Sequence, residues 1–186
     1  MFRLTRFFSV AALVVIVAAT VTIAAFNRHV AVDSLRLLAE SRNEALARLL
    51  VNAMWPRFAS YVAETLYRDP STLAGRAETR VIGTRVRELT SNLPVLKVKI
   101  YNLAGTTIYS SQESEIGEDR STNPGFESAR LGTVLSELAH RKEFDALEGE
   151  RFDIDVLSTY VPAQDMQGRT VGVIEVYSDV TPLVAQ

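Results

Sequence analysis

The feature that most constrains this chain is an uncharged run, Phe7 to Phe26, that reads FFSVAALVVIVAATVTIAAF. About 20 helical residues at about 1.5 Å each span the hydrocarbon core of a bilayer, roughly 30 Å. Arg3 and Arg6 precede the run and Arg28 follows it, and positive charge in the short leading segment favours a cytoplasmic N-terminus. The run therefore predicts one uncleaved transmembrane anchor in contact with membrane lipid, with the rest of the chain outside the cytoplasm.

A cleaved signal peptide is the competing interpretation of this run. The apolar region of such a peptide is usually about 7 to 15 residues long and ends in a small-x-small site. The run here is longer, and its nearest candidate site, Val17-Ala18-Ala19, lies inside the apolar stretch. We favour the uncleaved anchor, and a mature N-terminus near Thr20 or Asn27 would contradict it.

Composition limits the remaining classes of protein. A chain of 186 residues, 47% of them hydrophobic, has room for one ordinary domain and a membrane segment. A net charge of −2 without a long Lys/Arg run lacks the electrostatic signature of a nucleic-acid-binding protein. The absence of cysteine excludes disulfides, thiolate nucleophiles and thiolate metal sites. We therefore expect one sensing or binding module that does not bind nucleic acid.

Two helices are expected after the anchor. Apolar residues from Leu38 to Val62 recur with helical spacing, which predicts a long amphipathic helix. Pro56 predicts a kink or a helix boundary near Trp55, itself expected to lie in the core. Helical spacing resumes from about Arg76 and predicts a second helix ending near Asn92. A strict heptad in the first of these helices consists of Leu35, Leu38, Arg42, Ala45, Leu49 and Asn52. It is a poor coiled-coil seam, because Arg42 and Asn52 interrupt the apolar positions.

From Val95 the hydrophobic period changes to two. The alternation predicts a hairpin over residues 96–112, with its turn at Asn102 to Gly105, followed by strands at Thr133–His140, Phe152–Pro162 and Thr170–Asp179. The segment Gln112 to Gly132 contains a short predicted helix at residues 124–130. Loops and short helices that cross one face of a sheet are common places for small-molecule pockets.

These elements, in this order, resemble a known family. The anchor, the two helices, the hairpin VKIYNLAGTTIYSS, the IG loop and the closing strand GVIEVYSDVTP resemble the extracytoplasmic PAS-like (Cache-type) sensor domain of bacterial membrane-bound sensor histidine kinases and diguanylate cyclases. The resemblance covers Leu4 to Gln186. It implies an α+β fold in which an N-terminal transmembrane helix continues into a long helix packed on a five-stranded antiparallel PAS-like sheet. It also implies a parallel homodimer in the bacterial inner membrane, with the sensor domain in the periplasm.

The expected domain organisation follows from this resemblance. Residues 1–29 form the cytoplasmic N-terminus and anchor, 30–92 the helical stalk and second helix, 93–182 the PAS-like sensor sheet, and 183–186 the start of an exit helix. Thr181 and Pro182 are typical of a helix N-cap and first position. We expect the chain to be the input half of a larger signal-transduction receptor, or the product of a truncated reading frame.

No constellation of residues in the sequence predicts catalysis. His29 and His140 are isolated, and the hairpin lacks the Gly-Lys-Ser/Thr of a phosphate-binding loop. Asp153 and Asp155 share a strand face and could bind a divalent cation, but such pairs are more often solvated. We expect no enzyme activity, no metal and no cofactor.

Ligand contacts are expected instead from aromatic walls, hydrogen-bonding groups and one fixed cation, which together suit a small organic anion such as a carboxylate. The candidates are Tyr109, Arg120, Asn123, Phe126, Tyr160 and Tyr177. Core packing of the tyrosines, and pairing of Arg120 with Glu118 or Asp119, are the structural alternatives. For Lys97 and Lys99, cross-strand pairing with Glu175 is the simpler explanation.

The predicted function is therefore an extracytoplasmic signal-sensing module that passes ligand binding to the membrane helices. A structural or envelope-assembly protein with a single membrane anchor is the alternative, although the segment Arg3 to Arg6 lacks a pilin processing signal. A membrane-tethered hydrolase is disfavoured, because no nucleophile can be paired with a base.

Overall fold

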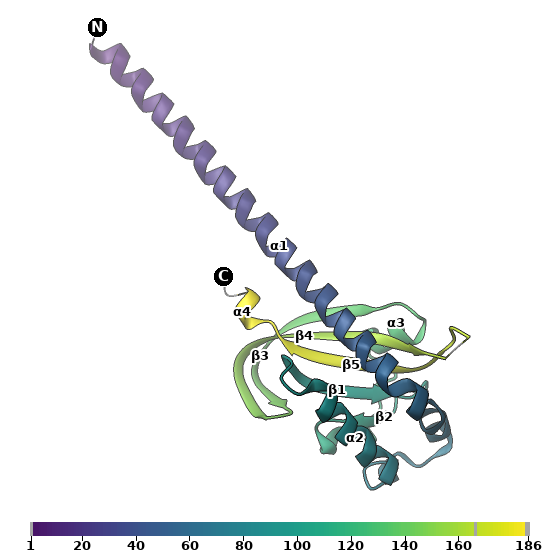
Figure 1. The fold of residues 1–186 in the computed structure, drawn as a ribbon. Helices are drawn as coiled ribbons and strands as arrows, with labels where there is room; N and C mark the ends of the chain where they lie inside the picture. The colour runs from purple at the N-terminus through teal and green to yellow at the C-terminus, as the bar shows by residue number, and fades with distance from the viewer. Residues whose placement is uncertain (1, 166, 185–186) are drawn as a thin grey trace. The chain divides into compact units, whose positions relative to one another are not determined.

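A computed structural model gives the backbone of residues 2–165 and 167–184, and the side chains of residues 12–13, 15–24, 26, 34–165 and 167–183. The helices are α1 (Phe2–Glu64), α2 (Ala77–Thr90), α3 (Pro124–Arg130) and α4 (Thr181–Val184) (Figure 1). The strands are β1 (Val95–Tyr101), β2 (Thr107–Ser110), β3 (Leu135–Ala146), β4 (Gly149–Gln164) and β5 (Thr170–Asp179). Short 3₁₀ helices lie at η1 (Thr65–Tyr67), η2 (Pro70–Thr72) and η3 (Glu113–Glu115). By internal contacts the chain divides into Met1–Leu38 and Ala39–Gln186, and the four-part domain organisation stays a prediction.

The five strands form one antiparallel sheet in the order β2-β1-β5-β4-β3. The last strand in sequence, β5, therefore lies in the middle of the sheet, between β1 and β4. The α+β class and the five-stranded antiparallel sheet are confirmed. The hairpin turn forms as predicted, since the Gly105 amide donates to the Asn102 carbonyl at 3.0 Å, and Gly105 has φ +87°, which favours glycine.

Helices α1 and α2 pack on one face of this sheet, which we call the helix face. Its core joins apolar side chains from both helices to alternate residues of the strands. Met54, Val62, Ile82 and Val86 come from the helices, and Val98, Ile100, Val161, Ala163, Ile174 and Val176 from the sheet. Trp55 is buried here as expected, and a Cβ at Gly172 would lie 2.6 Å from its ring. Because position 172 has no side chain, the indole can lie directly against β5.

Helix α1 does not end at Pro56, so of the two predicted alternatives near Trp55 the helix boundary is wrong and the kink stays a prediction. The helix continues to Glu64 with Pro56 in its interior. Proline removes one backbone donor, but Pro56 itself is exposed while Met54, Phe58 and Val62 are buried. Tertiary packing of these neighbours holds the helix together across the proline.

The hairpin of β3 and β4 is longer than the sequence predicted. It continues beyond the expected strand end at His140 to Ala146, and β4 begins at Gly149. The added residues are highly charged and lack a clear alternation, but the hairpin returns toward β1, where the Leu147 amide donates to the Leu96 carbonyl at 2.6 Å. Its Phe144 also packs beside Tyr177. Contacts at the tip therefore stabilise strands with weak local propensity.

The start of α4 differs in detail from the expected cap. The Asp179 carboxylate accepts the Thr181 amide at 2.9 Å, so Asp179 supplies a cap at this helix start. The Thr181 hydroxyl instead accepts the backbone amide of Asp155, also at 2.9 Å. Thr181 therefore ties the start of α4 to β4 rather than capping its own helix.

Within the described part of the chain, we find no helix with the length and apolarity needed to cross a membrane. The predicted span, Phe7 to Phe26, lies within α1. The side chains of its residues 7–11, 14 and 25 lie outside the described residues.

Candidate functional site

The face of the sheet opposite α1 and α2 is covered by the segment between β2 and β3, and we call it the loop face. Helix α3 packs here over Tyr101, Tyr160 and Val173 through Phe126 and Ala129. The rings of Tyr101 and Phe126 meet edge to face, with centroids 5.7 Å apart. The loop face thus has an aromatic wall built from two strands and a short helix.

Local sequence explains why α3 lies so close to the sheet. Asn123 caps the helix by accepting the Phe126 amide at 2.9 Å, and Pro124 occupies the first turn. A Cβ at Gly125 would lie 2.2 Å from the Tyr160 ring. Only glycine at this position lets the helix backbone rest on the tyrosine.

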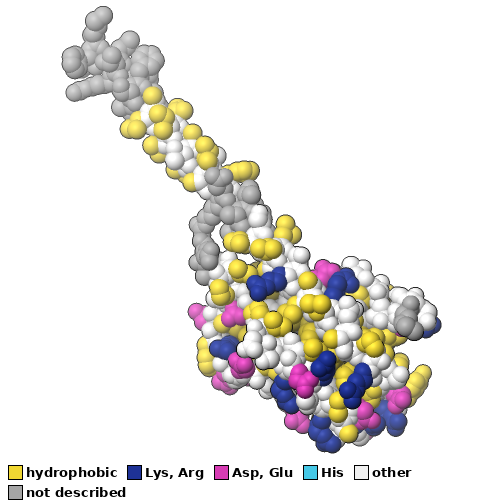
Figure 2. Space-filling view, viewed as in Figure 1, with side chains coloured by type: hydrophobic (Ala, Val, Ile, Leu, Met, Phe, Trp, Pro, Cys, Tyr) yellow, Lys and Arg dark blue, Asp and Glu magenta, His cyan; other side chains and the backbone are white. Residues whose placement is uncertain are grey.

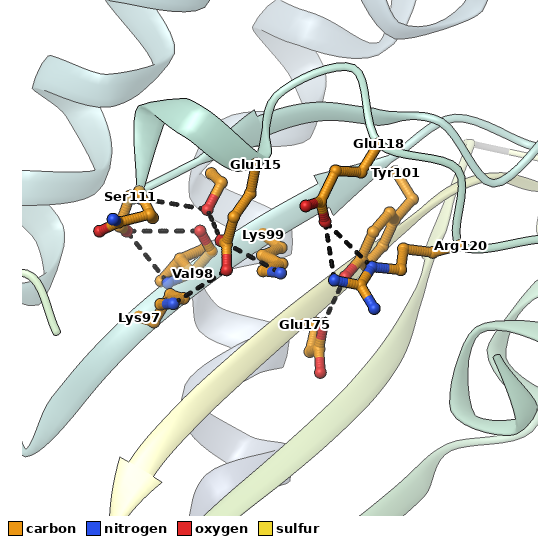
Figure 3. A network of polar contacts seen from close by, with 11 residues as sticks. Lys97, Val98, Lys99, Tyr101, Ser111, Glu115, Glu118, Arg120 and Glu175 are labelled. Carbon is orange, nitrogen blue, oxygen red and sulfur yellow. Dashed lines mark hydrogen bonds and ion pairs between the residues drawn. The ribbon is translucent and has the colours of Figure 1, made fainter. Parts of the chain in front are cut away.

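Glu175 of β5 lies at the centre of this face and is 1% exposed. The Tyr101 hydroxyl donates to its Oε2 (Figure 3), whereas its Oε1 has no hydrogen-bond partner among the described residues. Burial raises the pKa of Glu175, and the hydroxyls of Tyr101, Tyr160 and Tyr177 oppose that rise. A buried acceptor without a donor is costly, so Oε1 marks an unfilled hydrogen-bonding position.

A second buried charge cluster lies beside Glu175. The Nζ atoms of Lys97 and Lys99 each approach the Glu115 carboxylate at 3.1 Å (Figure 3), and the Ser110 hydroxyl donates to it at 2.6 Å. Burial works against ionisation of Glu115, but Ser110 and the two lysines outweigh it and lower its pKa. The ion pair is therefore formed between β1 and η3.

This arrangement corrects the expected pairing of the lysines. β1 and β5 are neighbours, and Lys99 stands opposite Glu175 in the register. The ion pairs, however, go to Glu115, which comes from the loop and was not considered. Lys99 still favours the charged form of Glu175 from a distance.

Arg120 lies at the outer side of the loop face. Its Nη2 is 2.7 Å from the Glu118 carboxylate, and its Nε donates to the same oxygen at 3.2 Å (Figure 3). Burial works against the charge of Arg120, but Glu118 and the phenols of Tyr101 and Tyr177 leave its pKa raised. The structural alternative for Arg120, pairing with Glu118, is thus observed, and its half-exposed guanidinium still lies near the phenols.

Comparison with solved structures identifies the fold. The sensor domain of the Vibrio cholerae histidine kinase DctB matches with a TM-score of 0.59 and 15% identity, over 86% of this chain and 58% of that chain. The chain has a PAS-like sensor-domain fold. The predicted resemblance to extracytoplasmic Cache-type sensor domains is confirmed at the level of the fold. This chain spans less than two thirds of the length of the DctB domain.

Two further solved structures have lower scores. The Escherichia coli DcuS sensor domain has a TM-score of 0.47 at 15% identity, over 84% of this chain and 96% of that chain. The periplasmic sensory domain of the Campylobacter jejuni chemoreceptor Tlp1 has a TM-score of 0.41 at 13% identity, over 82% of this chain and 59% of that one. No family model and no curated protein match the sequence of this PAS-like domain.

The fold divides the sequence-predicted ligand residues between two faces. Arg120, Asn123, Phe126, Tyr160 and Tyr177 belong to the loop face, and the last two lie near Glu175. Tyr109 instead joins the core of the helix face. Contact of these residues with a ligand stays a prediction.

Three polar residues of the loop face escaped the sequence analysis as site candidates: Tyr101, Glu115 and Glu175. Alternation places Tyr101 with Lys97 and Lys99, and Glu175 with Tyr177, so their shared face was visible in the sequence. That this face is the buried one under α3 was not, because the covering segment shows no periodicity.

His140 of β3 lies on a different part of the PAS-like domain. Its Nδ1 is 3.0 Å from Asp155 and its Nε2 is 3.2 Å from Asp153. The hydrogen bond that Asp155 accepts from the imidazole is the main cause that raises the pKa of His140. Each ring nitrogen thus faces a different carboxylate, and in the described part of the chain no three His, Cys, Asp or Glu side chains converge as metal ligands.

Proposed function

We propose that this chain is a membrane-anchored, extracytoplasmic signal-sensing module of a bacterial receptor, the input half of a sensor histidine kinase or diguanylate cyclase. It binds a small organic ligand on the loop face and transmits binding to α1. The module senses and does not catalyse, so kinase or cyclase activity would belong to another part of the receptor. The observation that carries the proposal is the buried, unpartnered Oε1 of Glu175 beneath the aromatic wall.

The ligand's chemistry follows from the groups around Glu175. A carboxyl oxygen such as Oε1 accepts a hydrogen bond from a hydroxyl or amino group, while the Arg120 guanidinium at the outer side of the face suits a carboxylate. Phe126 and Tyr160 supply apolar contact. We therefore propose an organic acid that also bears a hydroxyl or amino group.

Strand β5 connects this site with α1. Its Glu175 faces the loop, while the next residue, Val176, faces the helix and accepts from Asn43 Nδ2 through its carbonyl at 3.2 Å. The Ser178 hydroxyl donates to Asn43 Oδ1 at 2.5 Å, and Asn43 Nδ2 donates to Thr159 at 2.8 Å. A ligand that shifts β5 would change these bonds and so the seating of α1, provided it binds the two seatings with different affinity.

The first part of α1 supports the proposed anchor. Its described large apolar side chains are each more than half exposed, and Figure 2 shows apolar side chains in yellow on the surface of this part of the helix. They are Leu13, Val15, Ile16, Val17, Val21, Ile23 and Phe26. A continuous apolar surface of this kind needs hydrocarbon or a protein partner to cover it. The arginines at residues 3 and 6 favour insertion with the N-terminus in the cytoplasm.

We also propose a parallel homodimer along α1. Leu49 is 65% exposed and Ala45 is exposed, so these heptad positions are not used by the chain's own core. Arg42 and Asn52 interrupt the same seam, which predicts a weak contact that a ligand could readily alter.

The test is disulfide crosslinking in membranes, which the absence of native cysteine simplifies. Single cysteines would be placed at each position from Leu35 to Asn52, and crosslinking compared with and without those hydroxy and amino acids that raise the melting temperature of the full chain. We expect a shift in the pattern that Glu175→Gln abolishes. Identical patterns under all conditions, or a C-terminal reporter located in the cytosol, would contradict the proposal.

A further inference from the structure

A cavity of about 470 Å³ lies between α2 and the edge strand β2, away from Glu175. Small-molecule pockets are typically about 300 to 1,000 Å³, so its volume is sufficient for a small ligand. Its described lining includes Arg80, Gly83, Arg87, Tyr109, Ser111 and Glu113. Tyr109, the ligand candidate that the fold separates from the other five, therefore lies in a cavity of its own.

The arginines that line this cavity differ from the other arginines of α2 and its N-cap. Arg76 and Arg85 pair with Glu78 and Glu88, at 3.6 and 3.0 Å. Arg87 has neither an ion pair nor a hydrogen bond to any described residue, and Arg80 donates to the Gly75 carbonyl at 3.2 Å without a carboxylate partner. Of the four arginines between residues 76 and 87, the two at the cavity are thus those without a carboxylate partner among the described residues.

Helix geometry brings these two arginines to one side. They are seven residues apart, which is close to two full turns and about 10.5 Å along the axis. Gly83 lies between them and is buried, with the ring of Tyr109 packed against it, since a Cβ there would be 3.1 Å from the ring. Tyr109 therefore contacts the part of α2 that lies between the two arginines.

Tyr109 adds a polar group to the lining of the cavity. Its side chain is 5% exposed, and burial raises the pKa of the phenol while Arg87 opposes that rise. The phenol is therefore neutral at physiological pH and can donate a hydrogen bond. Among the described residues that line the cavity, Glu113 alone carries a carboxylate, so the lining has a net positive charge.

We propose that this cavity is a second ligand site, specific for a small organic carboxylate whose acid group binds Arg80 and Arg87 and whose apolar part contacts the edge of Tyr109 that lines the cavity. The ordinary alternative is that both arginines are solvated side chains on an exposed helix. This proposal does not depend on the proposed ligand site of the loop face, and each of the two can be tested without the other.

Isothermal titration calorimetry of the full chain with benzoate, and with sulfate as an inorganic anion, tests the proposal. We expect benzoate to bind, the double variant R80A/R87A to weaken binding about tenfold or more, and Tyr109→Phe to weaken it less. Sulfate should bind more weakly than benzoate, because it has no apolar part to contact Tyr109.

Two control variants distinguish a specific site at Arg80 and Arg87 from general binding to solvated arginines or to the loop face. Arg85→Ala removes an arginine of the same helix that pairs with Glu88, and Glu175→Gln changes only the loop face. Both should leave benzoate binding unchanged. The proposal is overturned if benzoate gives no heat at about 10 mM, if R80A/R87A binds like the unaltered chain, or if Arg85→Ala weakens binding equally.

Discussion

The two faces of the sheet bury different kinds of side chain. The helix face buries alternate apolar residues of β1, β4 and β5 under α1 and α2, whereas the loop face buries Lys97, Lys99 and Glu175 under a segment with little regular structure. Apolar burial stabilises directly, while buried charges cost free energy unless they are paired. The helix face therefore stabilises the fold, whereas the loop face buries polar groups at a cost in free energy, as functional sites commonly do.

The largest effect should come from the helix face. Met54→Ala removes a fully buried side chain from α1 and should lower the free energy of unfolding by about 2 to 5 kcal/mol, because it leaves a cavity. Urea denaturation of the full chain measures it. Ala53→Ser, on the exposed side of the same turn, is the control, and equal losses for both variants would contradict the division between faces.

The second largest loss of stability should come from Asn43, a polar residue that α1 places on the helix face. Asn43 is 3% exposed and bonds to β4 and β5. Asn43→Ala should lower the free energy of unfolding by about 1 to 3 kcal/mol, because Thr159 and Ser178 lose a partner. The exposed Asn52 of the same helix supplies the control, Asn52→Ala. A loss for Asn43→Ala no greater than for this control would mean that the network does not fix α1.

The carboxyl groups of Glu175 and Glu115 on the loop face should make the stability of the fold depend on pH. Glu175 has a raised pKa, so the folded state binds its proton more tightly, and stability is gained as pH falls through the folded pKa toward the ordinary value of 4.5. Glu115 has a lowered pKa, so its contribution is present above 4.5 and is lost as pH falls through its folded pKa. Melting curves between about pH 3 and 7 of Glu175→Gln and Glu115→Gln should therefore deviate from the unaltered chain in opposite directions.

Glu113→Gln is the control for this pair, because Glu113 is exposed in the same short helix η3. Its melting curve should parallel that of the unaltered chain. Deviations of the same sign for Glu175→Gln and Glu115→Gln would show that one of the two pKa directions is wrong.

The smallest effect is expected at His140, which belongs to the exposed edge of the sheet. Its raised pKa means that pairing with Asp153 and Asp155 stabilises the fold below the ordinary pKa of 6.5, and this contribution is lost as pH rises through the folded value. Titration of the imidazole by NMR should give a pKa above 6.5 that returns toward it in Asp155→Asn. An unshifted pKa in the unaltered chain would contradict the pairing.

Much of the helix face was predictable from sequence, and much of the loop face was not. Alternation located β1, β2 and β5, and helical spacing located α2, because periodic burial leaves a periodic pattern. The extension of β3 beyond His140 was missed, since its charged residues are held by contacts such as that between Leu147 and Leu96. The continuation of α1 through Pro56 likewise depends on tertiary packing.

The candidate site shows the same limit. The short helix at residues 124–130 was predicted with its residues, yet Tyr109 was grouped with Phe126 although the two lie on different faces. Alternation separates the faces of one strand but does not say which face a distant loop will cover. Glu175 and Tyr101 meet across 74 positions of sequence, a contact that no local pattern contains.

The close approach of Gly125 to Tyr160 makes the covering helix sensitive to a single methyl group. A Cβ 2.2 Å from the ring cannot be accommodated unless α3 moves away from the sheet or the tyrosine changes rotamer. Gly125→Ala should therefore keep α3 from packing closely on the loop face. One substitution thus gives experimental access to an uncovered form of the loop face, in which the entry of the proposed ligand can be studied separately from its recognition.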